Sequence, residues 1–395
     1  MRISIIGAGS IGSAVAHYLA EKDGVDEVRV CDARSRTLKL LHETVKSKKV
    51  RSYQVDGRDE TVLAPIVKDS GCIIGCASPS LNPALARLSL NLGSHFCDLG
   101  GNDAIVGEEL ALSETARDRG LWIVPNCGLA PGLINLLCLL GVDQFDAVES
   151  ARLRVGDIPV DPEPPFNFRL SVSARKLIDD YTLPAYMIRD GEVRQIEPLT
   201  NIEEITFREP FGTLEAFSTA SSLTTLTTEL ADRVRNLDMK TIRWPGHARQ
   251  MQFLLGLGFA EERIIDVGTH LTYNDVLVRR LQKKLGGDYA DAVLLRASIQ
   301  GRSAGTERTL VYEMIDRYAA EDGMSAMRRC TSLPIATVAH MLASAAVPAG
   351  GAMPPELALP RQTMFDELTE SGLEITTSWY DGFRQVTELS LSEAT

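Results

Sequence analysis

The chain has 395 residues, of which 44% are apolar and 24% charged, and its formal net charge is −12. This length exceeds what one hydrophobic core usually fills, so two domains are expected. The excess of acidic residues argues against nucleic acid or an anionic membrane surface as the main partner.

The first residues, MRISIIGAG, already form a strand-like pattern. They contain neither the basic nor the long apolar region of a signal peptide, and no run of 18 apolar residues follows. The seven cysteines are scattered and lack the spacing of a zinc site. We therefore expect a cytoplasmic protein with reduced cysteines and no metal.

Short β-branched and apolar runs alternate with helical patterns through the first 140 residues. The runs cover residues 3–7, 28–32, 50–56, 72–77, 94–99 and 121–125. Six strands separated by helices predict an α/β fold with a Rossmann-type, doubly wound parallel sheet, here assigned to residues 1–125.

The pattern changes from about residue 146, where alternating segments and an Asp190-Gly191 turn are typical of antiparallel strands and hairpins. We predict a second, α+β domain with a largely antiparallel sheet over residues 126–325. After about residue 325 a final helical segment follows.

The hexapeptide GAGSIG (7–12) follows the first strand and opens a helix. In such a G-x-G-x-x-G motif Gly7 permits the turn, Gly9 lets the backbone approach a pyrophosphate, and Gly12 allows close packing of helix and strand. The phosphates then lie on the helix N-terminus. The predicted cofactor contacts in this loop are Gly7, Ala8, Gly9, Ser10, Ile11 and Gly12.

The second strand ends at Asp32, 20 residues after Gly12 (32 − 12 = 20), and Ala33 follows it. A carboxylate here binds the ribose hydroxyls and repels a 2′-phosphate, which favours NAD. Arg34 and Arg36 favour NADP instead, because an arginine can bind the 2′-phosphate. The sequence therefore leaves both NAD and NADP as possible cofactors.

Later strand ends reach the same pocket. Asp56 is predicted to meet the adenine edge or, equally well, to cap a helix. Ala77, Ser78 and Pro79 are expected near the nicotinamide half, since ligands bind at the carboxyl ends of parallel strands. Asn82 is expected to cap the next helix.

The segment VPNCGLAPGLIN (124–135) follows the sixth strand. We predict that Cys127 and Gly128 line the cofactor and substrate, and that free N–H groups of residues 132–134 point toward the ligand. A tight corner without a ligand is the alternative. A nucleophilic role for Cys127 is disfavoured, because hydride transfer from an amine needs no covalent thiol intermediate.

The chain resembles the saccharopine dehydrogenase family, most closely its lysine 6-dehydrogenase-like branch. The segments that carry the resemblance are GAGSIG, CDLGGN (97–102), PNCGLAPGL (125–133), YTLPAYMIRDGEV (181–193), TLEAFST (213–219), RNLDMKTIRWPGHA (235–248) and MSAMRRCTSLP (324–334). The resemblance implies that the second domain supplies the substrate pocket and subunit contacts, and that residues 326–395 return to the Rossmann domain as a helical segment.

Several positions depart from the lysine 6-dehydrogenase pattern, so the substrate can differ from lysine. These positions are Pro125-Asn126, Ser218, Ser221-Ser222 and Trp244.

Oxidising an amine requires a group that takes the proton from nitrogen. His247 follows a Pro-Gly pair at a helix start, where the helix dipole favours a neutral imidazole that can act as a base; a packed histidine is equally expected. Asp98 and Glu215 are the other catalytic candidates, as base or ammonium ligand. The alternatives are a turn-capping Asp98 and a solvent-facing Glu215.

A substrate carboxylate calls for a cationic clamp, and Lys240 and Arg243 are predicted to supply it. Surface charge is the commoner role for such a lysine. Tyr181 is expected to close the pocket or to pack, and Gly100 to line it.

The leading hypothesis is an NAD(P)-dependent oxidoreductase that acts on the CH–NH or CH–NH2 group of an amino acid of lysine-like size. The alternatives are reductive C–N condensation of the saccharopine or carboxynorspermidine type with NADPH, and a catalytically silent dinucleotide sensor. Because sheet edges often pair, we expect a homodimer or higher homo-oligomer.

Overall fold

The computed structural model describes residues 1–220, 223–266, 268–321, 323–344, 347–348 and 350–385. The chain divides into two compact units. Unit 1 comprises Met1–Leu136 and Arg328–Leu373, and unit 2 comprises Leu137–Met327 and Glu374–Thr395. Within the described ranges, no helix combines the length and the apolar character that crossing a membrane requires.

Unit 1 is built on a seven-stranded parallel sheet in the order β15-β6-β5-β4-β1-β2-β3. The strands are β1 (Arg2–Ile6), β2 (Glu27–Asp32), β3 (Val50–Gln54), β4 (Cys72–Gly75), β5 (His95–Asp98), β6 (Trp122–Val124) and β15 (Gly351–Ala352). The six predicted strands and the doubly wound order are confirmed. The strand order reverses between β1 and β4, and the carboxyl ends of these two strands therefore form the edge where ligands bind in this fold.

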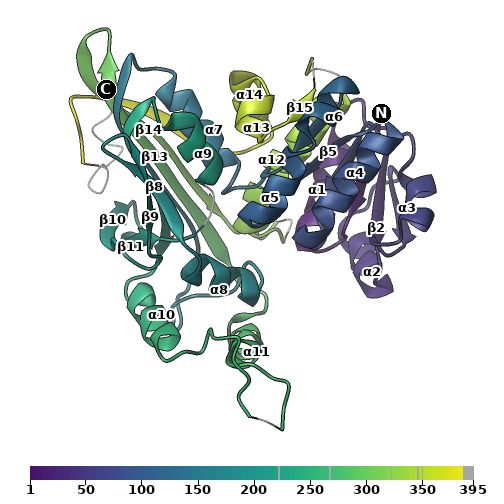
Figure 1. Cartoon of the computed structure of the whole chain (residues 1–395), viewed down its shortest axis with the longest axis horizontal. Coiled ribbons are helices and arrows are strands. Elements are labelled where there is room, and N and C mark those ends of the chain that lie inside the picture. Colours follow the sequence, from purple (N-terminus) through teal and green to yellow (C-terminus); the bar gives the residue numbers. More distant parts are fainter. Residues whose placement is uncertain (221–222, 267, 322, 345–346, 349, 386–395) are drawn as a thin grey trace. The chain divides into compact units, whose positions relative to one another are not determined.

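Helices connect the parallel strands, and Figure 1 shows α1 and α4 lying against the sheet. Polar side chains fix two helix starts: Asp59 caps α3 and Asn102 caps α5. The helices of the N-terminal part are α1 (Ser10–Glu21), α2 (Ser35–Thr44), α3 (Glu60–Val67), η1 (Pro79–Leu81), α4 (Asn82–Leu92), α5 (Asp103–Leu110), α6 (Ser113–Asp118) and α7 (Leu133–Val142).

Unit 2 contains a nine-stranded mixed sheet, mostly antiparallel, in the order β10-β11-β12-β7-β13-β14-β16, with β8 and β9 joined to β12. Its strands are β7 (Ala147–Pro159), β8 (Ala185–Arg189), β9 (Glu192–Ile196), β10 (Glu203–Phe207), β11 (Gly212–Ser218), β12 (Val234–Arg243), β13 (Asp291–Ser303), β14 (Thr306–Arg317) and β16 (Ile375–Asp381). The hairpin β8/β9 forms at the predicted Asp190-Gly191 turn, and β13/β14 is a second hairpin. Among the described strands of this sheet, only β12 and β7 pair in parallel.

The two faces of this sheet have different cores. On β12, residues 238, 240 and 242 lie on one face and residues 239, 241 and 243 on the other, because side chains alternate along a strand. Ile242 packs with Leu214 and Leu294 in one apolar cluster. Phe217 packs with α8 (Ala174–Thr182), α10 (His247–Gly256) and α11 (Tyr273–Leu285) in another. The short helix α9 (Thr224–Leu230) precedes β12.

The C-terminal part differs from the single helical segment that we expected over residues 326–395. Most of α12 (Ala326–Ala343), with α13 (Pro355–Ala358) and α14 (Arg361–Glu370), belongs to unit 1. The strand β16 pairs antiparallel with β14 and so belongs to the sheet of unit 2. Its sequence ITTSWYD is rich in β-branched and aromatic residues, which favour a strand.

Candidate functional site

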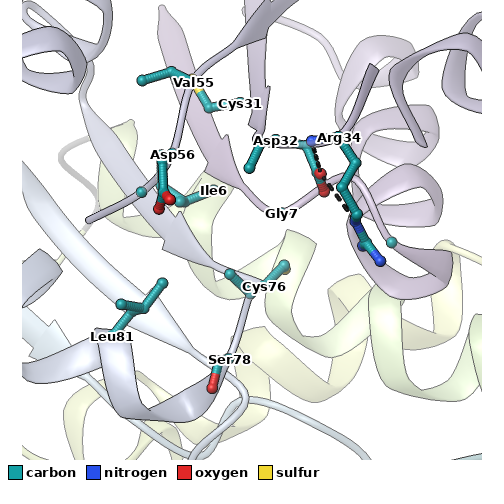
Figure 2. Close-up of a pocket in the computed structure, with 14 residues that line it drawn as sticks. Ile6, Gly7, Cys31, Asp32, Arg34, Val55, Asp56, Cys76, Ser78 and Leu81 are labelled. Carbon is teal, nitrogen blue, oxygen red and sulfur yellow. Dashed lines mark hydrogen bonds and ion pairs between the residues drawn. The ribbon is translucent and has the colours of Figure 1, made fainter. Parts of the chain in front are cut away.

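A cavity of about 280 Å³ lies at the carboxyl edge of the unit 1 sheet. Figure 2 shows side chains from the ends of β2, β3 and β4 arranged around Gly7. The lining residues are Ile6, Gly7, Gly9, Cys31, Asp32, Ala33, Arg34, Val55, Asp56, Gly57, Cys76, Ala77, Ser78 and Leu81.

The glycine loop has the close contacts that a dinucleotide-binding turn needs. Gly7 adopts a φ of +110°, and a Cβ there would lie 2.5 Å from the Cys76 carbonyl oxygen. A Cβ on Gly12 would lie 1.9 Å from the Gly7 carbonyl oxygen. By contrast, a Cβ on Gly9 would meet no atom within 4 Å. Gly7 and Gly12 are therefore required by packing, whereas Gly9 keeps open space at the start of α1.

The start of α1 suits an anion. Its N-cap residue is Gly9, so no side chain satisfies the first N–H groups of the helix. These N–H groups and the helix dipole favour a negatively charged group in the space next to Gly9. Ser10, Ile11 and Gly12 form the first turn of α1 but, like Ala8, do not line the cavity.

Asp32 is held beside the loop by two backbone donors. The N–H of Ala8 donates to Oδ2 at 2.9 Å, and the N–H of Arg34 donates to Oδ1 at 2.8 Å. The Arg34 Nε also lies 3.4 Å from Oδ1, as the dashed lines in Figure 2 indicate. The carboxylate of Asp32 and the guanidinium of Arg34 both line the cavity, while Arg36 does not.

Asp56, Ala77 and Ser78 also line the cavity, and Pro79 does not. The Arg58 side chain donates to both Asp56 oxygens, which lowers the pKa of Asp56 to about 2. Six lining residues were not predicted, namely Ile6, Cys31, Val55, Gly57, Cys76 and Leu81. The sequence could have identified them, because each lies at the end of a predicted parallel strand or in the segment that follows it.

The segment after β6 makes internal contacts. Cys127 is fully buried, its thiol donates to the Val124 carbonyl at 3.1 Å, and burial raises its pKa. Neither Cys127 nor Gly128 lines the cavity. The expectation of free N–H groups at 132–134 is wrong for two of the three residues, because Leu133 donates to Gly128 and Ile134 to Leu129.

Asp98 ends β5 and is fully buried. Its Oδ1 accepts the N–H of Gly100 at 2.5 Å. Gly100 has a φ of +84°, and a Cβ there would lie 2.0 Å from the Asn126 side-chain oxygen. Asn82 begins α4 without capping it, and its amide approaches the Gly100 carbonyl at 3.5 Å. The turn after β5 is therefore in contact with the segments that follow β4 and β6.

His247 and Tyr181 meet in the core of unit 2. The His247 Nδ1 lies 3.1 Å from the Phe166 carbonyl, so this nitrogen carries the proton and Nε2 accepts from the Tyr181 hydroxyl at 3.0 Å. The rings of Phe166, Phe168 and Phe217 surround the imidazole. Burial, followed by the charge of Arg243, lowers the pKa of His247 to about 3. In this arrangement His247 is a packed, neutral histidine.

Glu215 binds the start of α10. Its two carboxylate oxygens accept the N–H groups of Gly246 at 2.8 Å and Ala248 at 2.7 Å. This is the favourable position for a carboxylate at a helix N-terminus. The Glu215 side chain is buried rather than directed to solvent.

Lys240 and Arg243 are not brought together. They stand on opposite faces of β12, because their spacing of three residues is odd. Lys240 pairs with Glu203, which also binds Arg154. Arg243 pairs with Asp157 at 3.3 Å and stacks over Phe168, and its Nε–H donates to none of the described residues. Lys240 and Arg243 therefore cannot bind the same substrate carboxylate in this structure.

Two of the positions that depart from the lysine 6-dehydrogenase pattern make structural contacts. The Trp244 indole donates to the Pro159 carbonyl at 2.9 Å, and the Ser218 hydroxyl accepts from Asn201 at 3.3 Å. Ser221 and Ser222 lie outside the described residues. In the described part of the chain, no three His, Cys, Asp or Glu side chains are grouped to hold a metal ion.

Gly9→Ala tests the loop. Since the added methyl group meets open space, we expect an unchanged melting temperature but a loss of dinucleotide affinity of about tenfold or more, because the methyl occupies the pyrophosphate position. Calorimetric titration with NAD and NADP measures this loss. The control is Gly107→Ala, an equally unhindered glycine in the exposed part of α5. Equal affinity in Gly9→Ala and the wild type would refute the assignment.

The buried imidazole predicts acid sensitivity. The unfolded chain binds the His247 proton near pH 6.5 and the folded protein only near pH 3, so unfolding takes up a proton between these values. The stabilising effect of neutral His247 is complete above about pH 7 and is lost as the pH falls, by about 1.4 kcal/mol per pH unit. Urea unfolding of the wild type and of His247→Gln between about pH 6 and pH 4 measures how the free energy of unfolding depends on pH. An equal dependence of the free energy of unfolding on pH in both proteins would contradict the prediction.

Comparison with known proteins places this geometry in a family. Residues 3–124 match the model of the saccharopine dehydrogenase NADP binding domain, and residues 128–373 match that of the saccharopine dehydrogenase C-terminal domain. The chain is 22% identical over 316 residues to the mitochondrial alpha-aminoadipic semialdehyde synthase of Bos taurus. That alignment covers 73% of this chain and only 33% of the bovine protein, so the chain spans about a third of this curated relative.

Two solved structures share the fold over nearly the whole chain. Apo saccharopine dehydrogenase (L-Glu forming) from Saccharomyces cerevisiae has a TM-score of 0.78 at 16% identity, covering 96% of this chain and 99% of that one. Homospermidine synthase from Legionella pneumophila, in complex with NAD, has a TM-score of 0.66 at 15% identity, covering 99% and 95%. Since the two family models together account for most of the sequence, the chain belongs to the saccharopine dehydrogenase family.

Proposed function

We propose that the protein is an NAD(P)-dependent oxidoreductase that acts on a CH–NH or CH–NH2 group of an amino acid, with oxidative deamination as in lysine 6-dehydrogenase. The observation that carries the proposal is the cavity in unit 1, where Gly9 leaves space at the start of α1 and Asp32 stands beside the loop. The family supports a C–N bond as the reacting group.

In this reaction the amine carbon gives up a hydride and the nitrogen gives up a proton, which leaves an imine that water hydrolyses to a carbonyl compound and ammonia. A bound nicotinamide supplies the hydride acceptor. The residues of unit 1 bind and orient it: the N–H groups at the start of α1 receive the pyrophosphate, and Asp32 receives the ribose.

Arg243 is the residue of unit 2 that we propose for the substrate carboxylate. Its Nε has no hydrogen-bond partner among the described residues, whereas Lys240 is engaged by Glu203. Of the two predicted cations, only Arg243 has a nitrogen without a partner among the described residues, although it also pairs with Asp157. A single cation at the site favours the oxidative reaction, because a condensation of two amino acids requires a clamp for each carboxylate. His247 and Asp98 remain candidates for the proton acceptor, and both must exchange their present hydrogen bonds to act.

The second candidate is reductive C–N condensation with NADPH. It is supported by the names of the similar structures, a saccharopine dehydrogenase and a homospermidine synthase, and by the NADP binding domain model.

A substrate panel tests the function. Purified protein is mixed with NAD or NADP and lysine, other diamines or amino acids, and with NADH or NADPH and pairs of a 2-oxoacid or aldehyde with an amine. We expect reduction of NAD with a lysine-like substrate, followed as nicotinamide absorbance. Oxidation of NADPH with a carbonyl–amine pair would favour condensation. Tight dinucleotide binding without any turnover would contradict both and favour the sensor.

Asp32 is the residue that we propose to select NAD. Asp32→Asn keeps an oxygen for the Ala8 N–H but removes the charge that repels a 2′-phosphate, so the ratio of NADP to NAD affinity should rise by about tenfold. Calorimetric titration of both dinucleotides measures the ratio. Glu43→Gln, on the exposed side of α2, removes the same charge and should leave the ratio unchanged. An unchanged ratio in Asp32→Asn would contradict the assignment to the ribose.

A further inference from the structure

The helix α10 of unit 2 has an exposed apolar face. Its inner face carries Ala248 and Met251, which are fully buried in the cluster formed with α8 and α11. In Figure 1, α8 and α11 both lie to one side of α10. On the opposite face Phe253 is 70% exposed, and Leu257, at the end of the helix, is 61% exposed. Residues four apart are neighbours on a helix surface, so these two side chains form one apolar surface.

The space beside this surface is open. A Cβ on Gly256, between the two apolar residues, would meet no atom within 4 Å, so a side chain of another molecule can approach there. Among the large apolar residues that the structure describes, Phe253 and Leu257 have the greatest exposed fractions. Exposed apolar side chains that lie together mark an interaction surface, whereas scattered ones do not.

The charges at the two ends of α10 are the reverse of those that suit a single helix. Arg249 is exposed in the first turn, where the helix dipole disfavours a cation. The carboxylate of Glu261 lies at the other end, since its Oε1 would be 2.5 Å from a Cβ on Gly258. The dipole disfavours an anion at that end. Glu261 also lies 3.6 Å from Arg263, but an ion pair between two exposed side chains contributes little.

A second copy of the chain fits this surface. If a two-fold axis passes between Phe253 and Leu257, the two α10 helices run antiparallel, and Phe253 of each copy faces Leu257 of the other. Arg249 of each copy then approaches Glu261 of the other. Each charge also lies near the end of the opposite helix that its sign suits. The surface is therefore self-complementary, as a two-fold interface must be.

We propose that two copies of this chain form a homodimer through the outer faces of α10. Phe253 and Leu257 form the apolar centre of the contact, and Arg249 pairs with Glu261 of the second copy at both ends. A stable interface buries about 800 Å² on each partner, and the outer face of one helix supplies only part of that area. We therefore expect a reversible dimer with a Kd in the micromolar range.

Sedimentation velocity over a series of protein concentrations tests the apolar centre. The wild type should pass from monomer to dimer as the concentration rises. Phe253→Glu places a charge in the centre of the contact, so the Kd of the dimer should rise by about tenfold or more. Leu40→Glu, at a 50% exposed position of α2, introduces the same charge at another apolar surface residue and should dimerise as the wild type does.

Exchange of the charges tests the second copy and its orientation. Arg249→Glu and Glu261→Arg each place like charges at both ends of the contact, so each variant should be monomeric where the wild type is a dimer. An equimolar mixture of the two variants should form a heterodimer, because opposite charges then meet at both ends. This recovery requires that Arg249 of one copy lies beside Glu261 of the other.

A wild type that is monomeric at every concentration, or a dimer that Phe253→Glu leaves intact, would overturn the proposal. A dimer that either charge variant leaves intact, or a mixture that stays monomeric, would overturn the antiparallel pairing. If Phe253→Glu does not fold, as judged by circular dichroism, the charge variants and their mixture decide. The measurements involve neither dinucleotide nor substrate, so their outcome is independent of the proposed function.

Discussion

The close approach of Gly7 to the end of β4 is the constraint on which unit 1 depends. The N–H of Gly7 donates to the Cys31 carbonyl at 2.7 Å, and its Cα packs on the Cys76 carbonyl. Gly12 in turn packs on the Gly7 carbonyl. These contacts hold β1, β2, β4 and α1 together at one point, and they leave the start of α1 facing the cavity. The same backbone geometry thus serves packing and ligand binding.

Buried charge has a different use in the two units. In unit 2, Glu215 binds the start of α10, and Glu203 forms ion pairs with both Arg154 and Lys240. These groups have their partners within the protein and stabilise its elements. In unit 1, Asp32 and Asp98 each hold backbone N–H groups of turns at the carboxyl edge. Carboxylates there fix the shape of the loops that a dinucleotide would contact.

Much of the fold was predictable because its signals are local. The six β-branched runs and GAGSIG identify the parallel sheet, and the Asp190-Gly191 turn identifies the β8/β9 hairpin. The strand β15 has only two residues, and β16 joins a sheet whose other strands lie far earlier in the sequence. Such short or distant pairings leave no periodic signal, so residues 326–395 were predicted as a C-terminal helical segment without strands of its own.

The site was predictable where the backbone determines it, and less so where side chains do. Gly7, Gly9, Asp32 and Asp56, which the sequence singled out, line the cavity. The alternation along β12 would have separated Lys240 from Arg243, since their spacing is odd. Glu109 follows Val106 by three residues on the buried face of α5, so the helical spacing was the available signal for a buried acid at this position.

The central claim is that the carboxyl edge of unit 1 binds a dinucleotide at Gly7–Gly12 and Asp32. A crystal structure of the protein with NAD tests it most directly. The account predicts that the pyrophosphate accepts hydrogen bonds from N–H groups at the start of α1 and that a ribose hydroxyl donates to Asp32. A dinucleotide bound elsewhere, or a ribose directed away from Asp32, would contradict it.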